Sequence, residues 1–203
     1  MKYPENIKKI TALQPDYLGF IFWKKSSRLM DVELIPELPE TTKKVGVFVD
    51  ASATEIRSKV AQYQLDIVQL HGNESASFCT EIKQLNVEII KVFSIDTNFD
   101  FSVLEEFLPM VDYFLFDTKG KLPGGNGFTF DWKILENYPL EKPFFLSGGI
   151  GVNEIEAIKD FQKTKVAEKC IAIDVNSQFE TKPGLKNTIE LEKFKKLLYE
   201  NEI

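Results

Sequence analysis

The chain has 203 residues, of which 43% are hydrophobic and 28% charged, so it has enough apolar material for one packed core. Its 25 Lys and Arg residues are outnumbered by 31 Asp and Glu residues, which argues against a nucleic-acid binder that neutralises phosphates. No run approaches the ~20 apolar residues of a membrane span, and the first ten residues, MKYPENIKKI, do not resemble a signal peptide. We therefore expect one cytoplasmic domain over residues 1–203, with reduced cysteines and no membrane partner.

A helix followed by a strand opens the predicted fold. Pro4 suits the first turn of a helix, and Ile7, Ile10 and Leu13 then recur at helical spacing. Seven short apolar runs follow: YLGFIF from Tyr17, VGVFV from Val45, IVQL from Ile67, IIKVF from Ile89, YFLFD from Tyr113, FFLSGG from Phe144 and IAIDV from Ile171. The runs are rich in Val, Ile, Phe and Tyr and apolar at consecutive positions, which is typical of parallel strands buried on both faces.

Helical patterns lie between these runs. Three begin with a capping signature, in which Ser or Asn precedes Glu by three residues: Ser52 with Glu55, Asn153 with Glu156 and Asn187 with Glu190. Apolar stripes at helical spacing accompany them: Ile56, Val60 and Tyr63; Phe78, Ile82 and Leu85; Ile155 and Ile158; Leu191, Phe194 and Leu198. Strands that alternate with helices predict a parallel sheet with right-handed crossovers.

The spacing of the runs favours a barrel over an open sheet. Six intervals cover the 154 residues from Tyr17 to Ile171, roughly 26 residues per repeat, and eight repeats is the standard number for a barrel. Because a helix precedes the first run, stepping back one repeat places an absent strand about nine residues before Met1. We therefore predict a (β/α)8 TIM barrel that lacks its first strand, with seven strands from Tyr17–Phe22 to Ile171–Asp174. The alternative is a seven-stranded open α/β sheet.

Polar residues follow the carboxyl ends of several strands, where such barrels hold their active sites. Arg28, in the polar loop WKKSSR, could pair with a substrate carboxylate or lie solvated on the surface. Asp117 and Asp174 end buried strands, where a carboxyl group with a raised pKa can donate a proton, although a structural role is the alternative. His71 is an acid or base, or a hydrogen-bonded scaffold residue.

Glycine-rich loops are predicted at the same face. Gly148 and Gly149 lack side chains, so their N–H groups can approach an anion, and the last two loops of such barrels usually bind phosphate. The alternative is that these glycines only form a tight turn. The segment Thr118–Thr129 is predicted to be a further loop at this face. Two cysteines and one histidine would need oxygen ligands to complete a metal site, and we predict none.

Six blocks of this sequence together resemble phosphoribosylanthranilate isomerases, which act in tryptophan biosynthesis. The blocks are GFIFWKKSSR, KKVGVFVD, VQLHGNES, FDTKGKLPGGNGFTFDW, PFFLSGGI and IDVNSQFETKPGLK, and the resemblance runs from Pro4 to the last helix. The K-S-x-R loop, QLHG and GGNGFTFDW, in this order along the chain, are its most specific part. One departure is NSQFE where many members read SSGVE, which puts Gln178 at a glycine position of the phosphate loop.

The resemblance implies an isomerisation that needs no cofactor. N-(5'-phosphoribosyl)anthranilate would undergo an Amadori rearrangement to 1-(2-carboxyphenylamino)-1-deoxyribulose 5-phosphate. Asp117 would be the general acid, and Arg28 would hold the anthranilate carboxylate. The residues that match the phosphate loops and the rest of the substrate site are Gly148, Gly149, Asn176, Ser177, Asp174 and His71. The implied partner is a small phosphorylated molecule.

The family's general base is a cysteine in a K-x-C-G motif at the end of its first strand. The segment Met1–Asn6 resembles the residues directly after that motif. Cys79 is predicted on an outer helix, and Cys170 lies four residues before Asp174, about 13 Å away toward the opposite face. We therefore expect this chain to be inactive. We also expect it to pair with a second copy across the open edge, as a homodimer, or to be weakly stable there.

Two other functions fit parts of this pattern. One is another phosphate-binding barrel, such as an indole-glycerol-phosphate synthase or a pentose-phosphate epimerase. The synthase would need catalytic lysines, and the epimerase would need metal-binding histidines. The other is a non-enzymatic remnant that binds anthranilate-type ligands without turnover.

Overall fold

Seven parallel strands form one sheet in the computed structural model, which describes residues 1–118 and 131–199. They are β1 (Tyr17–Ile21), β2 (Lys43–Phe48), β3 (Ile67–Leu70), β4 (Glu88–Ile95), β5 (Tyr113–Thr118), β6 (Phe144–Leu146) and β7 (Cys170–Ile173). Each matches a predicted strand, and their order in the sheet follows the chain from β1 to β7. A doubly wound open sheet would instead reverse its strand order at one point.

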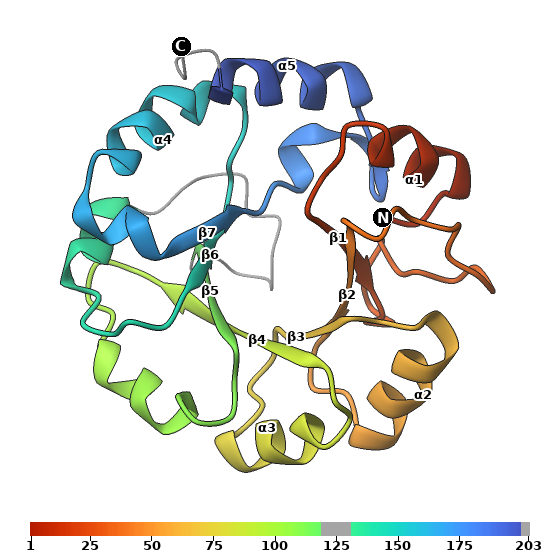
Figure 1. Ribbon diagram of the computed structural model, residues 1–203, viewed down its shortest axis with the longest axis horizontal. Helices are drawn as coiled ribbons and strands as arrows, with labels where there is room; N and C mark the ends of the chain where they lie inside the picture. The colour runs from red at the N-terminus through yellow and green to blue at the C-terminus, as the bar shows by residue number, and fades with distance from the viewer. Residues whose placement is uncertain (119–130, 200–203) are drawn as a thin grey trace.

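Helices surround the strands (Figure 1). The α-helices are α1 (Pro4–Thr11), α2 (Ala53–Tyr63), α3 (Ala76–Lys83), α4 (Ile155–Gln162) and α5 (Thr188–Tyr199). Short 3-10 helices cover Phe101–Phe107, Trp132–Asn137, Val152–Glu154, Lys165–Lys169 and Ser177–Phe179, and a small hairpin pairs β8 (Glu180–Lys182) with β9 (Leu185–Lys186). Among the described residues, no helix is long and apolar enough to cross a membrane.

The predicted caps are confirmed at two helices and wrong at one. Ser52 accepts a hydrogen bond from the Glu55 N–H at 3.2 Å, and Asn187 caps α5 in the same way. Asn153, however, lies inside a 3-10 turn, and α4 begins two residues later. There the Glu154 carboxylate accepts a hydrogen bond from the Gly151 N–H at 2.7 Å instead.

The connection from β1 to β2, residues 22–42, contains no helix, so our expectation of a helical crossover is wrong there. Pro36 and Pro39 fall in its second half, and proline interrupts a helix because it lacks an N–H and clashes with the preceding turn. A single bridge between Ile21 and Leu29 folds the start of this connection back along β1. This brings Arg28 to the carboxyl end of the strand.

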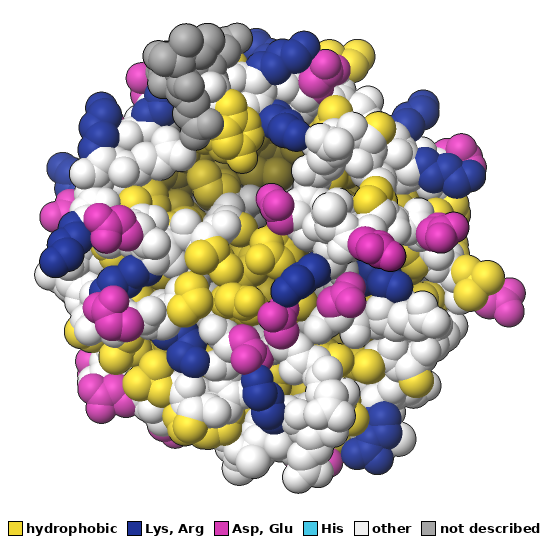
Figure 2. Space-filling model, in the orientation of Figure 1, with side chains coloured by type: hydrophobic (Ala, Val, Ile, Leu, Met, Phe, Trp, Pro, Cys, Tyr) yellow, Lys and Arg dark blue, Asp and Glu magenta, His cyan; other side chains and the backbone are white. Residues whose placement is uncertain are grey.

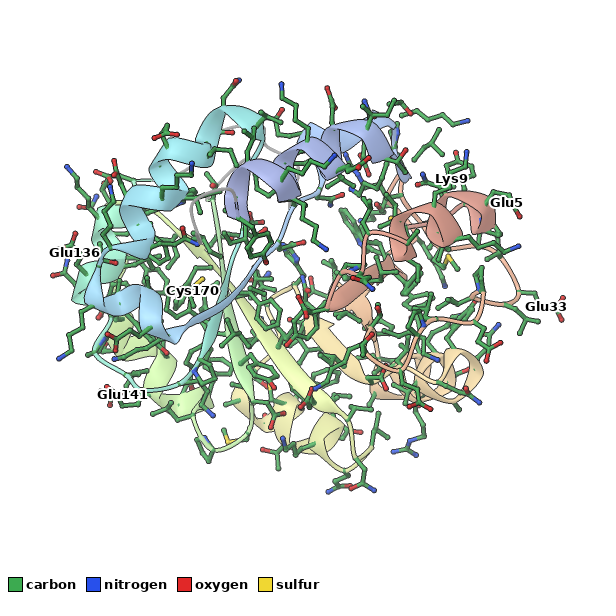
Figure 3. All side chains as sticks on the ribbon, turned by 45° about the horizontal axis from the view of Figure 1, so that its top comes forward. Glu5, Lys9, Glu33, Glu136, Glu141 and Cys170 are labelled. Atoms are coloured by element: carbon green, nitrogen blue, oxygen red, sulfur yellow. The ribbon has the colours of Figure 1, made fainter. Side chains whose placement is uncertain are left out.

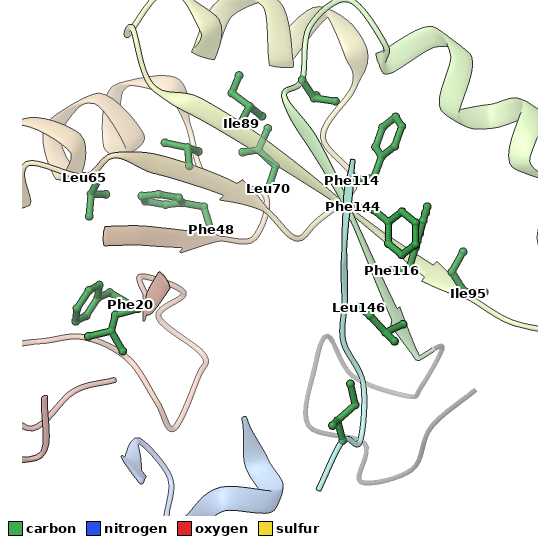
Figure 4. Close-up of a cluster of buried hydrophobic side chains, with 14 of the residues drawn as sticks. Phe20, Phe48, Leu65, Leu70, Ile89, Ile95, Phe114, Phe116, Phe144 and Leu146 are labelled. Atoms are coloured by element: carbon green, nitrogen blue, oxygen red, sulfur yellow. The ribbon is translucent and has the colours of Figure 1, made fainter. Parts of the chain in front are cut away.

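The larger apolar core lies between the sheet and the helices. Its fully buried members include Phe20, Phe48, Leu70, Phe114, Phe116 and Phe144 (Figure 4). Consecutive strand residues point to opposite faces of a sheet. The apolar runs therefore supply this outer core and, with their alternate residues, an inner one.

The inner cluster shows how far the sheet curls. Its buried members are Val45, Ile67, Ile90, Val92, Leu115 and Phe145. The ring of Tyr17 in β1 packs edge-on against Phe145 in β6, with 4.9 Å between the ring centroids. A first strand that touches the sixth across the interior belongs to a barrel-like sheet and excludes a flat one.

The sheet is open between β1 and β7. In the part of the chain that the structure describes, β1 and β7 form no pair with each other. Ile171 in β7 is 43% exposed, whereas β6 beside it is fully buried. A cavity of about 650 Å³ borders both strand edges and apolar side chains of α1 and α5, among them Ile10 and Phe194. Figure 2 shows a hollow with hydrophobic walls in the upper half of the view.

Candidate active site

The polar residues of the site continue the inward-facing rows of the inner core. Asp117 follows Leu115 by two residues, and Asp174 follows Ala172 in the same way. Because side chains alternate along a strand, both carboxylates face the interior at the carboxyl ends of β5 and β7. The structure therefore brings them to one end of the sheet, where both line the cavity.

Asp117 is buried, with 4% of its surface exposed, and its carboxylate has two neighbours. Oδ1 accepts a hydrogen bond from the Thr118 N–H at 2.9 Å. Oδ2 lies 3.4 Å from His71 Nε2, which is longer than a well-formed hydrogen bond. The Gln69 amide donates to His71 Nδ1 at 3.2 Å, so a neutral ring carries its proton on Nε2, facing Asp117.

A buried ion pair holds the loop that carries His71. Lys91 Nζ contacts the Glu74 carboxylate at 2.9 Å and donates to the Gly72 carbonyl at 2.7 Å. Glu74 in turn accepts hydrogen bonds from the Gly72 and Asp50 N–H groups. Because Gly72 directly follows His71, this network holds the backbone that carries the imidazole in place.

Asp174 sits beside Asp117 in a different environment. Burial raises the pKa of the Asp174 carboxyl group, and the negative charge of Asp117 raises it further. Ser147 Oγ donates a hydrogen bond to this carboxylate at 3.1 Å, and that hydrogen bond opposes the rise in pKa. The two carboxylates are thus electrostatically coupled.

The loop after β6 packs directly against Asp117. Gly148 has a φ of +97°, and a Cβ atom there would lie 2.2 Å from Thr118 Oγ1 and 2.8 Å from Asp117 Oδ1. Gly149 follows with a φ of +67°. Glycine is required at position 148 both for the backbone conformation and for this close approach.

The loop after β7 lies beside the glycine loop. A Cβ atom at Gly151 would be 3.2 Å from Gln178 Cβ, so the two loops touch. Asn176 and Ser177 border the same cavity as Gly148 and Gly149. Gln178, which departs from the family pattern, is exposed and packs on Gly151.

Arg28 approaches the site from the opposite side of the open edge. Its Nε and Nη2 atoms both lie 2.8 Å from Glu180 Oε2. Arg28 borders the same cavity as the two carboxylates, so all eight predicted site residues line one space. An arginine has five N–H donors, and the contact with one oxygen atom leaves donors for a ligand.

Comparison with known proteins identifies the family. The family model described as "N-(5'phosphoribosyl)anthranilate (PRA) isomerase" matches residues 1–197. An N-(5'-phosphoribosyl)anthranilate isomerase from Parabacteroides distasonis is 43% identical over 201 residues, covering 96% of this chain and 88% of the relative. A second, from Phocaeicola vulgatus, is 38% identical, covering 96% and 92%. The chain belongs to the phosphoribosylanthranilate isomerase family.

A solved phosphoribosylanthranilate isomerase shares the fold of this chain. Its structure has a TM-score of 0.78 and 25% identity, and the match covers 98% of this chain and 95% of the other. That enzyme was solved in complex with reduced 1-(o-carboxyphenylamino)-1-deoxyribulose 5-phosphate. The family match supports an isomerase of tryptophan biosynthesis and gives no support to the synthase, the epimerase or a non-enzymatic remnant.

Two charged residues beside this candidate site were missed at the sequence level. Glu180 and Lys186 lie on the small hairpin, with side chains that are 5% and 8% exposed. Burial lowers the pKa of Lys186, and the negative charge of Glu180 opposes this shift. Burial alone would raise the pKa of Glu180, but the contacts with Arg28 and Lys186 outweigh burial and lower it. The Pro-Gly pair in ETKPGLK is a turn signal that could have revealed the hairpin, and Gly184 has a φ of +81°.

Neither cysteine lies at the carboxyl end of a strand. Cys79 is buried in α3, as predicted, and burial raises its pKa to about 11. Cys170 borders the cavity at the beginning of β7 (Figure 3), and burial raises its pKa to about 12. Both thiols are therefore protonated near neutral pH.

Within the described parts of the chain, no three His, Cys, Asp or Glu residues are grouped to hold a metal ion. The predicted loop Thr118–Thr129 lies, beyond Thr118, outside the described residues.

Proposed function

We propose that the cavity binds N-(5'-phosphoribosyl)anthranilate and that Asp117 is the general acid of its Amadori rearrangement. The observation that carries this proposal is the position of Asp117, a buried carboxylate that faces the cavity beside His71. A protonated Asp117 would give its proton to the ribose ring oxygen as the ring opens. The nitrogen of the anthranilate group then forms a double bond to C1'.

The two ends of the substrate are anions, and the cavity offers a different kind of donor to each. Arg28 would hold the anthranilate carboxylate through its planar guanidinium group. The phosphate would be held by backbone N–H groups near Gly149 and Ser177, with Gly148 and Asn176 shaping the loops. The product analogue named for the solved relative carries a carboxylate and a phosphate of the same kind.

The second step removes the C2' proton and needs a base. We propose that an extended strand ending in the family's Lys-x-Cys-Gly motif occupies the opening between β1 and β7 and completes an eight-stranded barrel. Support comes from the two unpaired strand edges and from the apolar walls of the cavity between them. The strand's cysteine would be the base, and without that base we expect turnover to be slow. Asp174 and His71 are the groups that would act instead if turnover were near normal.

The role of Asp117 is tested by Asp117→Asn. The amide keeps the volume and the hydrogen bond from Thr118 but has no acidic proton to donate. We expect kcat to fall about 10²–10⁴-fold with little change in KM, because general acid catalysis acts in the transition state. Turnover is measured as consumption of phosphoribosylanthranilate, in the chain supplemented with the strand described above. An unchanged kcat would show that Asp117 is not the acid.

Pairing of two copies across the opening stays a prediction. Unpaired strand edges recruit other chains unless something covers them. Sedimentation velocity at several protein concentrations tests whether this chain is a dimer.

A further inference from the structure

The hairpin of β8 and β9 connects the two sides of the open sheet. On one side, Glu180 Oε2 accepts hydrogen bonds from Arg28, which follows β1. On the other side, Lys186 Nζ donates to the carbonyl of Asn176, which follows β7, at 2.9 Å. Glu180 Oε1 joins the two arms, since it lies 3.1 Å from Lys186 Nζ and accepts the Gly184 N–H at 3.0 Å.

The first helix is attached to the same hairpin. The Asn6 side chain donates to the Lys186 carbonyl at 2.9 Å and accepts from the Lys186 N–H at 2.8 Å, as a backbone partner would. Asn6 is itself buried. The hairpin is therefore held to α1 on the β1 side and to the loop after β7 on the other side.

The burial of this network makes its geometry specific. Two nearly buried charges are tolerated only when each is paired and hydrogen-bonded, and Glu180 and Lys186 satisfy both conditions. A surface ion pair would allow many arrangements, but here the oxygen atoms of one carboxylate are divided between two partners. Movement of Arg28 is thus coupled to movement of Asn176.

We propose that Glu180 and Lys186 are positioning residues that hold the carboxylate-binding Arg28 at a fixed distance from the phosphate loop at Asn176 and Ser177. This inference rests on the proposed function, which assigns those two ends of the site to the two anionic ends of the substrate. Glu180 does not line the cavity and acts through Arg28, and Lys186 acts through Asn176. The hairpin links the two sides of the open edge, as hydrogen bonds between neighbouring strands link the rest of the sheet.

The test uses the two halves of the substrate as separate ligands. Anthranilate probes the Arg28 side, and ribose 5-phosphate probes the loop at Ser177. Calorimetry gives the dissociation constant of anthranilate with and without saturating ribose 5-phosphate, and the ratio of the two constants is the coupling factor. A change in overall charge alters both constants alike and cancels in this ratio, so the ratio reports on coupled geometry.

We expect Glu180→Ala to lower the coupling factor about tenfold relative to the parent chain. Lys186→Met should do the same by cutting the other arm, and it decides the question if Glu180→Ala does not fold. Lys182→Met, an exposed lysine of the same hairpin, is the matched control and should leave the factor unchanged. A folded Glu180→Ala or Lys186→Met protein with the parent's coupling factor would overturn the positioning role alone. A parent chain that binds neither half would overturn the proposed function as well.

Discussion

Gly148 shows how closely one residue type can be tied to a site. The loop after β6 passes so near Thr118 and Asp117 that a single added methyl group would overlap both. The residue also has a positive φ, which L-amino acids with a side chain rarely adopt. A glycine at this position therefore allows the loop after β6 to pack directly against the proposed acid, Asp117.

Gly148→Ala is expected to destabilise the fold by about 2–4 kcal/mol, since it combines strain with a clash in a packed region. Urea unfolding of parent and variant measures the difference. Gly19→Ala is the control, because a Cβ at Gly19 meets only a Val47 methyl group at 3.9 Å. Equal losses for the two variants would contradict the close-approach argument.

The raised pKa of Asp174 has a consequence for stability. Between the ordinary pKa of an aspartate and the higher folded value, the folded state binds more protons than the unfolded state, so stability falls as pH rises. Asp174→Asn removes this penalty. We expect the variant to match the parent in acid and to gain on it as pH rises, by about 1.4 kcal/mol for every tenfold by which folding weakens the acid. Unfolding curves over the acid to neutral range test this, and a variant that loses stability with rising pH relative to the parent would contradict it.

At the scale of elements, the opening between β1 and β7 can be tested by adding a strand-forming peptide. We expect a short peptide of consecutive apolar residues ending in the Lys-x-Cys-Gly motif to raise both the melting temperature and the turnover. Binding to the folded state alone stabilises it by mass action, and the cysteine adds a base worth about 10²–10⁴-fold. The matched peptide with serine in place of cysteine should raise only the melting temperature. If neither peptide changes the melting temperature, the opening does not accept a strand.

Elements with strong local signals were predictable, and those that depend on distant contacts were not. The strands were found because each is a short β-branched and aromatic run between turn residues. The cap at Asn153 was wrong because the Gly151 N–H is already satisfied by Glu154, which lets a 3-10 turn precede the helix. The hairpin was missed because its strands are only three and two residues long and mostly polar, although its Pro-Gly turn was visible.

At the scale of the whole molecule, the sequence predicted which residues share a site better than what holds them there. Parallel strands bring their carboxyl ends together, so Asp117, Asp174 and His71 could be grouped from strand ends alone. The pairing of Arg28 with Glu180 joins residues 152 positions apart and leaves no periodic signal. The pairing of Lys91 with Glu74 leaves no periodic signal either, because only the fold brings this strand lysine and this loop glutamate together in a buried position.

The cavity runs without interruption from the opening between β1 and β7 to the side chains of Arg28 and Asp117. Water therefore has a path to Arg28, whose side chain is 21% exposed, from the side as well as from the open face, and the dielectric constant around Arg28 is higher than in a closed barrel. Charge–charge attraction between Arg28 and a ligand carboxylate is then weak and screened by dissolved salt over about 8–10 Å. Closing the opening would exclude water as well as complete the sheet, so each ionic contact at the site would become stronger without moving an atom.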